Sequence, residues 1–411
     1  MRAYSKLLDS LMKLGSIKVS DIVRSLNTNA EKNGNGLLYV VYSLNSDISI
    51  EAYFTRFYLA VTNGSLRIRG DWRKAEEFSK IMLRDTVIGN GKKLVMLFRD
   101  EGEEYVKIPT RPSSSITMNP AVSFITSSIL TLIIFLLLTK YGILLTLTVV
   151  IAQVLLTNIA YTYVSFLRMI KLRVNGSSII KVTATLPIDV PEDTLTRLIS
   201  YASSIRSISK NQLALLISGL RAIGGSMILN ISIERVLVPS IKGVNVYLVP
   251  SPECNAVSLN LINKVIVVST KLVACLNEDE LKAVIHHELG HIVNKDTYKA
   301  LAASVAYSLT SAMMLLYVIP RAGLTIVTIT AYTLIALLAV VTSLALSRIN
   351  ETKADLYALS SGYKESLATA LVKVTYPSIH SSLVKRIFLS HPTTLSRINA
   401  ILKMTKRLNE R

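Results

Sequence analysis

The sequence predicts a membrane α-helical protein that carries an α+β domain and, ahead of it, a separate N-terminal mixed α/β domain. The chain has 411 residues, of which 50% are hydrophobic, and its mean hydropathy is +0.44. This average is too apolar for an ordinary soluble protein. Four uncharged stretches are each long enough to cross a hydrocarbon core of about 30 Å. Charged segments with helix and strand patterns separate them, so water-soluble parts are expected as well.

Residues 1–116 have the patterns of a mixed α/β domain. Apolar residues recur at helical spacing near the start of the chain, and strand-like runs follow at 37–42, 57–62 and 93–98. The first residues contain no apolar core of the length that a secretory signal needs, so the N-terminus is expected to stay in the cytoplasm. The sequence does not predict the role of this domain.

The apolar stretches pair as two transmembrane hairpins, over 119–167 and 300–347. The four stretches are 119–139, 141–167, 300–320 and 322–347. Lys140 divides the first hairpin, and Arg321, between Pro320 and Gly323, divides the second. Both turns are therefore too short to hold a domain.

Positive charge lies almost entirely outside the hairpins. All but two of the 46 Lys and Arg residues fall in 1–118, 168–299 and 348–411, which two hairpins place on one side of the membrane. Positive residues near span ends favour the cytoplasm, so both termini and both parts of the α+β domain, 168–299 and 348–411, are expected there. The predicted location is the cell membrane, with four spans.

The basic surface suits contact with the lipid bilayer. Clusters such as Lys171 with Arg173 fit anionic lipid headgroups. Basicity that is spread this evenly gives no reason to expect nucleic acid as a partner. The alternatives are that the basic surface is only solvated and that the apolar stretches are buried helices of a large core. The oligomeric state is not predicted.

The pattern that carries chemistry is NEDELKAVIHHELGHIVNKD, from Asn277 onward. Asn277 and Glu280 form a helix-capping signal, and apolar residues at helical spacing follow. On the predicted helix, His287 and His291 lie one turn apart, where one tetrahedral zinc ion accepts both imidazoles. Glu288 lies to the side of this pair, close enough to act as a base on a water molecule.

A catalytic zinc ion needs a third protein ligand and an open fourth position. Glu351 is the candidate, because the second hairpin leaves the membrane face after His291 and returns to it just before Glu351. Asp355, one turn further, is placed to accept a hydrogen bond from the non-ligating nitrogen of a zinc histidine. One Zn²⁺ per chain, held by His287, His291 and Glu351, would make the α+β domain a gluzincin-type metallopeptidase domain.

Three features have plainer interpretations as well. The HExxH pattern is short and also occurs by chance in helices. His286 faces another side of the helix and is expected at the surface or behind a ligand rather than on the metal. Cys254 and Cys275 match no zinc or disulfide framework and are expected to be ordinary reduced thiols.

With these residues in order, the chain resembles the HtpX-like membrane metallopeptidases, relatives of the CAAX prenyl proteases. The resemblance covers about 185–405 and rests on the blocks 249–256, 265–268, 278–296, 347–355, 390–392 and 397–398. It implies the zinc ligands and the base named above, and cleavage of damaged membrane proteins at the cytoplasmic face. It also makes His391 and Arg397 candidates for stabilising the negative charge that develops in the reaction. A surface helix is the alternative for these two residues.

Residues 254–260 are expected to form an edge strand to which an extended protein or peptide substrate adds, which suits a quality-control protease because backbone pairing tolerates many sequences. The expected substrate-strand residues are Asn255, Ala256, Val257 and Ser258. Val257 and Ser258 stand where the family usually has Phe and Ala, and His286 stands where Ala is usual. Two alternatives stay open: a CAAX-type endoprotease acting on prenylated peptides, and a catalytically inactive zinc-containing membrane adaptor, which would need four protein ligands.

Overall fold

The fold is that of a computed structural model of the chain. It describes residues 3–18, 21–22, 25, 37–43, 49–54, 57–62, 65–88, 91–109, 129, 133, 143–168, 171–323, 325–375 and 392–409. Most of the predicted span 119–139 lies outside these residues, as does His391.

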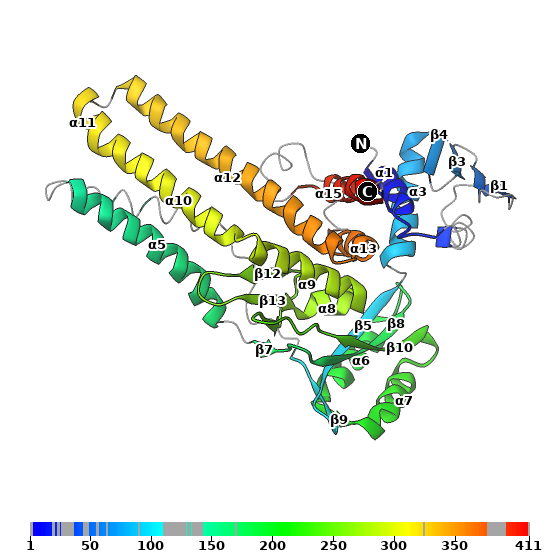
Figure 1. Cartoon of the computed structure of the whole chain (residues 1–411). Coiled ribbons are helices and arrows are strands. Elements are labelled where there is room, and N and C mark those ends of the chain that lie inside the picture. The colour runs from blue at the N-terminus through cyan, green and yellow to red at the C-terminus, as the bar shows by residue number, and fades with distance from the viewer. Residues whose placement is uncertain are drawn as a thin grey trace.

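Three long helices extend side by side from an α/β body (Figure 1). They are α5 (Ile143–Arg168), α10 (Asp296–Met313) and α12 (Ile326–Ser360). α10 packs against both of the others. It continues through a π-helical turn (Met314–Val318) and α11 (Ile319–Ala322), and Gly323, with φ of 71°, then turns the chain toward α12. The two helices of the second predicted hairpin therefore pack against each other.

Within the described part of the chain, α12 is the one helix that is both long and apolar enough to cross a membrane. Many of its apolar side chains are exposed, including Ile326 at 84% and Leu338 at 65%. An exposed apolar surface of this extent suits contact with lipid. The apolar part of α5, Leu147–Thr157, is shorter. The number and orientation of the spans stay predictions.

Two sheets form the body next to these helices. The antiparallel five-stranded sheet runs in the order β10 (Asn230–Leu237), β8 (Ser178–Leu186), β5 (Lys92–Asp100), β6 (Glu104–Lys107) and β9 (Ser207–Ser209). The four-stranded sheet runs in the order β12 (Ala256–Leu259), β13 (Val265–Ser269), β11 (Asn245–Val249) and β7 (Leu172–Arg173). Both sheets contribute to one hydrophobic core, in which Ile179 and Val246 pack with Ile285. The predicted strand at 265–268 is confirmed as β13.

Helices cover these sheets, and one of them contains the two predicted ligand histidines. The helices of the body are α6 (Glu192–Ser204), α7 (Leu213–Gly224), α8 (Thr270–Cys275), α9 (Glu278–Val293), α13 (Lys364–Thr375) and α15 (Thr394–Asn409), with short 3₁₀ turns at Lys210–Gln212 and Gly225–Met227. α9 packs against α12 and α13, and also against β12.

The N-terminal part has a sheet of its own. The elements are α1 (Ala3–Lys13), β1 (Leu37–Ser43), β2 (Ser49–Phe54), β3 (Phe57–Thr62), β4 (Ser65–Gly70), α3 (Trp72–Leu83) and a π-helical turn (Arg84–Ile88). The four strands form an antiparallel meander in chain order. The strands predicted at 37–42 and 57–62 are confirmed as β1 and β3.

The N-terminal part is less separate than the sequence predicted. β5 lies inside the expected 1–116 domain but pairs with β8 from Lys92 opposite Leu186 to Arg99 opposite Ile179. α1 also shares a hydrophobic core with α13 and α15, and Ser10 Oγ bonds Asn399 Oδ1 of α15 at 2.9 Å. The physical reason is burial, because the apolar faces of α1 and β5 find their partners in the later part of the chain.

Candidate metal centre

α9 begins where the capping signal predicts. The Asn277 side chain accepts a hydrogen bond from the Glu280 backbone N–H at 2.8 Å, and the Glu280 carboxylate accepts one from the Asn277 N–H at 2.9 Å. Acidic residues in the first turn favour the positive end of the helix dipole. The predicted helix and its capping box are therefore confirmed.

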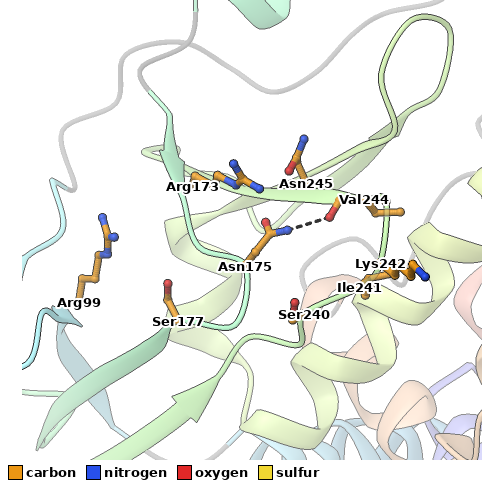
Figure 2. Close-up of a pocket in the computed structure, with 10 residues that line it drawn as sticks. Arg99, Arg173, Asn175, Ser177, Ser240, Ile241, Lys242, Val244 and Asn245 are labelled. Carbon is orange, nitrogen blue, oxygen red and sulfur yellow. Dashed lines mark hydrogen bonds between the residues drawn. The ribbon is translucent and has the colours of Figure 1, made fainter.

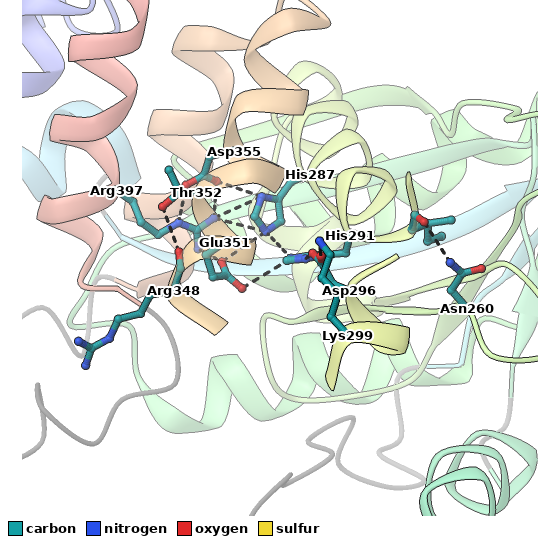
Figure 3. A network of polar contacts seen from close by, with 11 residues as sticks. Asn260, His287, His291, Asp296, Lys299, Arg348, Glu351, Thr352, Asp355 and Arg397 are labelled. Carbon is teal, nitrogen blue, oxygen red and sulfur yellow. Dashed lines mark hydrogen bonds and ion pairs between the residues drawn. The ribbon is translucent and has the colours of Figure 1, made fainter. Parts of the chain in front are cut away.

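His287 and His291 lie on one face of α9, with their Nε2 atoms 3.3 Å apart. α12 packs against this face and brings the Glu351 carboxylate to both rings (Figure 3). Its Oε2 lies 3.5 Å from His287 Nε2, and its Oε1 lies 3.6 Å from His291 Nε2. Glu351 is buried, as is Glu288, whose carboxylate lies within 4.8 Å of the histidine nitrogens.

The two histidine nitrogens and the Glu351 carboxylate are spaced as ligands of one zinc ion. In a tetrahedron with bonds of about 2.0 Å, neighbouring ligand atoms are about 3.3 Å apart. The two Nε2 atoms are 3.3 Å apart, which matches this edge length, and each of them lies 3.5 or 3.6 Å from one of the two Glu351 oxygens. Two imidazole nitrogens and a carboxylate oxygen are also the donor types that zinc accepts at catalytic sites. The residues therefore fit a zinc ion.

The outer nitrogen of each histidine contacts a carboxylate. His287 Nδ1 lies 3.0 Å from Asp355 Oδ1, as the sequence predicted for Asp355. His291 Nδ1 lies 2.9 Å from Asp296 Oδ2, and Lys299 holds the other oxygen of Asp296 at 2.8 Å. Such contacts fix the orientation of each ring and direct its Nε2 toward the other histidine and Glu351.

Asp296 was not identified from the sequence. It opens α10, and Lys295 before it adopts the left-handed conformation with φ of 56°. This turn directs the start of α10 back toward His291. The signal in the sequence was an aspartate five residues after His291, which alone does not indicate such a bend.

Arg397 of α15 lies behind the ligands and binds two carboxylates. Its Nε and Nη2 lie 2.9 and 2.6 Å from the two oxygens of Asp355, and Nη1 lies 3.1 Å from Glu351 Oε2. The sequence suggested that Arg397 would face the charge that develops on a substrate. In this structure its donors point at Asp355 and Glu351, where they balance the negative charge of two buried groups.

The electrostatics of the cluster favour a protonated His287. Burial lowers the pKa of this imidazole, and the charge of Arg397 lowers it further. Hydrogen bonds to Asp355 and Glu351 outweigh both effects and raise the pKa to about 10. A metal ion that binds here has to displace this proton.

The remaining predicted residues lie around the cluster. His286 turns away from it, because its Nδ1 is 2.8 Å from the Lys282 carbonyl oxygen and its ring packs on Tyr363.

β12 is the outer strand of its sheet and contains Ala256, Val257 and Ser258, with Asn255 directly before it. At its far end Asn260 donates to the Ile292 carbonyl at 3.0 Å, which ties the strand to α9 beside His291 (Figure 3). The predicted edge strand is therefore present next to the cluster.

Gly290 allows α9 and α12 to approach closely. A Cβ atom at this position would lie 2.9 Å from Ala354 Cα and 3.0 Å from Tyr357 Cβ, both on α12. We expect Gly290→Ala to lower the free energy of unfolding by about 1–3 kcal/mol, because overpacking forces the helices apart. Thermal unfolding of the purified protein measures this effect, with Val293→Ala on the exposed side of α9 as the control. Equal stability of Gly290→Ala and wild type would contradict the close packing.

The fold and the cluster define a class of protein. In this class, a helix with an HExxH motif and a glutamate from a neighbouring helix form a candidate metal site on an α/β body. Comparisons with known proteins place the chain in the same class. The family described as peptidase family M48 matches residues 226–405. The chain is 31% identical over 197 residues to a protein named protease HtpX homolog from Trichormus variabilis, covering 40% of this chain and 68% of that protein. It is 32% identical over 176 residues to the protease HtpX homolog of Pyrococcus abyssi, covering 34% and 60%.

The chain belongs to peptidase family M48 and is HtpX-like, as its sequence motifs predicted. A solved structure, that of Ste24p from S. mikatae, aligns with 68% of this chain and 63% of its own at 16% identity and a TM-score of 0.41. Residues 1–225 lie outside the family match.

Proposed function

We propose that this protein is a zinc-dependent endopeptidase that cleaves protein substrates at the cytoplasmic face of a membrane. The observation that carries the proposal is the convergence of His287, His291 and Glu351 at the edge length of a zinc tetrahedron, with the buried Glu288 carboxylate beside them. Membership of a peptidase family supports peptide-bond hydrolysis as the reaction.

Each residue of the cluster has a chemical role in this proposal. A bound zinc ion supplies a Lewis acid that polarises the scissile carbonyl. Glu288 takes a proton from the attacking water and passes it to the leaving amine nitrogen. Asp355 and Asp296 hold the two imidazoles in orientation, and Arg397 holds Asp355 and Glu351. His391, outside the described residues, remains a proposed donor to the developing negative charge.

The position of β12 at a sheet edge is evidence for an extended, unfolded polypeptide as the substrate. An added strand at a sheet edge pairs through its backbone, which requires no particular sequence. Because β12 is fastened to α9 through Asn260, a chain lying along Ala256–Leu259 would run beside the cluster. This geometry favours a role of the protein in the quality control of misfolded or damaged membrane proteins.

Two observations favour action at a membrane. Glu351 and the exposed apolar residues belong to one continuous helix, α12, so the site lies close to the end of the segment that suits lipid. Three of the ten residues that line an open hollow of about 740 Å³ next to β7 are basic, namely Arg99, Arg173 and Lys242, and the others are uncharged (Figure 2). These cations suit the anionic headgroups of a cytoplasmic leaflet. Four spans and cytoplasmic termini belong to the same proposal.

The test is cleavage of an unfolded protein such as reduced casein by the purified chain. We expect cleavage with zinc, loss of cleavage after chelation, and recovery when zinc is returned. Cleavage confined to a farnesylated peptide would instead favour the CAAX-type alternative. Stoichiometric zinc without cleavage of either substrate would contradict the proposal and favour the inactive adaptor.

A further inference from the structure

The two cysteines of the chain lie side by side, 21 positions apart in sequence. Cys254 lies in the connection between β11 and β12, directly before the candidate substrate strand. Cys275 is the last residue of α8, two positions before the residue that caps α9. Their Sγ atoms are 3.3 Å apart, and both side chains are half-buried. Both are free thiols in this structure, as the sequence predicted.

The backbone on both sides of the pair is already held together. The Ser251 N–H donates to Thr270 Oγ1 at 3.3 Å, and the Ser269 N–H donates to the Asn255 carbonyl at 3.0 Å. Ser269 Oγ accepts from the Asn255 N–H at 3.2 Å and from the Leu272 N–H at 3.0 Å. A disulfide bond is about 2.0 Å long, so the two sulfur atoms need to approach by only about 1.3 Å.

The neighbouring groups shift the pKa values of the two thiols in opposite directions. The hydrogen bond with Cys254 lowers the pKa of Cys275, burial opposes this, and the positive charges of Lys271, Lys93 and Lys181 lower it further. The same hydrogen bond and burial raise the pKa of Cys254. These pKa directions favour Cys275 as the attacking sulfur, with Cys254 as the second thiol.

We propose that Cys254 and Cys275 form a reversible dithiol–disulfide site that reacts with low-molecular-weight disulfides such as oxidised glutathione. The Cys275 thiolate attacks one sulfur of the reagent, which forms a mixed disulfide and releases one thiolate. Cys254 then loses its proton and attacks Cys275 Sγ, which closes the protein disulfide and releases the second thiolate. The protein is oxidised by two electrons, and the reagent is reduced to two thiols.

Closing this bond would join the start of the candidate substrate strand to the connection that leads into α9. Oxidation would then restrict how far β12 moves relative to the helix that contains His287 and His291. The proposed disulfide site is distinct from peptide hydrolysis, and its readouts are thiol content and stability. Its failure and the failure of the proposed function are therefore distinguishable.

The experiment equilibrates the full chain, in detergent micelles, against reduced and oxidised glutathione at a series of ratios. Free thiols are counted by the gel shift of a maleimide–polyethylene glycol conjugate. We expect both thiols to disappear together at one midpoint, without dimers. We also expect a peptide map that contains a Cys254–Cys275 cross-link, and a Tm that rises on oxidation and returns with dithiothreitol, because a cross-link constrains the unfolded chain.

Single-cysteine variants provide the matched controls. In Cys254→Ser and Cys275→Ser the Tm should not respond to dithiothreitol. The remaining Cys275 of the first variant, which still has Lys271, Lys93 and Lys181 nearby, should form the glutathione mixed disulfide faster than the remaining Cys254 of the second. Alanine variants replace the serine variants if these do not fold. Two thiols that persist in folded wild type at the most oxidising ratio, or disulfides only between chains, would overturn the proposal.

Discussion

Replacing Glu288 by Gln is expected to leave zinc bound and to lower kcat/KM for an unfolded protein substrate by roughly 10²–10⁴-fold. The magnitude is the usual contribution of a positioned general base. Glutamine has nearly the same shape, so the packing of this buried position is preserved. It has no basic oxygen, so it does not take a proton from water. The measurement combines metal content by mass spectrometry with initial rates of casein cleavage.

The control for this experiment is Asp279→Asn, which removes a carboxylate from the exposed first turn of the same helix. It should cleave at the wild-type rate and keep its zinc. If Glu288→Gln also cleaved at the wild-type rate, Glu288 would not be the base. If the variant lost zinc together with activity, its carboxylate would instead be a ligand or a support of the ligands.

The parts of the site that the sequence predicted are those that local geometry determines. The capping residues Asn277 and Glu280, and the spacing of His287 and His291, depend only on the regular turn of one helix. Glu351 is distant in sequence but follows a hairpin whose two helices return the chain to its starting point. Each of these residues lies where the sequence expected it.

The parts that escaped prediction depend on backbone details or long-range partners. Asp296 reaches His291 because Lys295 adopts a left-handed conformation, which is uncommon for lysine and has no sequence signal. Arg397 was a candidate site residue, but its pairing with Asp355, 42 residues earlier, could not be predicted because no periodicity relates the two.

The sheet of the body also depends on a long-range pairing. The alternating apolar pattern of β5 identified a strand, but its pairing with β8 could not be predicted. Such a pattern shows which face of a strand is buried, and it does not show which other strand pairs with it. For this reason the expected boundary near 116 does not separate two independent folding units, and β5 belongs to the five-stranded sheet of the body.

The cluster partly offsets the negative charge of its carboxylates before any metal is added. The carboxylates of Glu288, Glu351 and Asp355 are buried together, and the guanidinium of Arg397 is the cation that contacts two of them. Buried carboxylates of this density are costly unless they are paired. Arg397 therefore keeps Asp355 and Glu351 in place, and a zinc ion held by His287, His291 and Glu351 would add further positive charge to the cluster.

His291→Ala is expected to reduce zinc from one ion per chain to nearly none. The substitution removes one of three protein ligands, and the two that remain do not complete a stable tetrahedral site. Asp296→Asn should act more weakly, lowering zinc affinity by about 10–100-fold, because it disturbs only the orientation of the His291 ring. Both effects are measured as metal content after dialysis against a series of buffered zinc concentrations.

His286→Ala is the matched control, because it removes the same side chain from the same helix at a position that faces Lys282 and Tyr363 instead of the cluster. It should keep one zinc ion per chain. Circular dichroism of all three variants separates loss of a ligand from loss of α9. Stoichiometric zinc in folded His291→Ala would show that this histidine is not a ligand, and loss of zinc in folded His286→Ala would assign the metal to the other face of the helix.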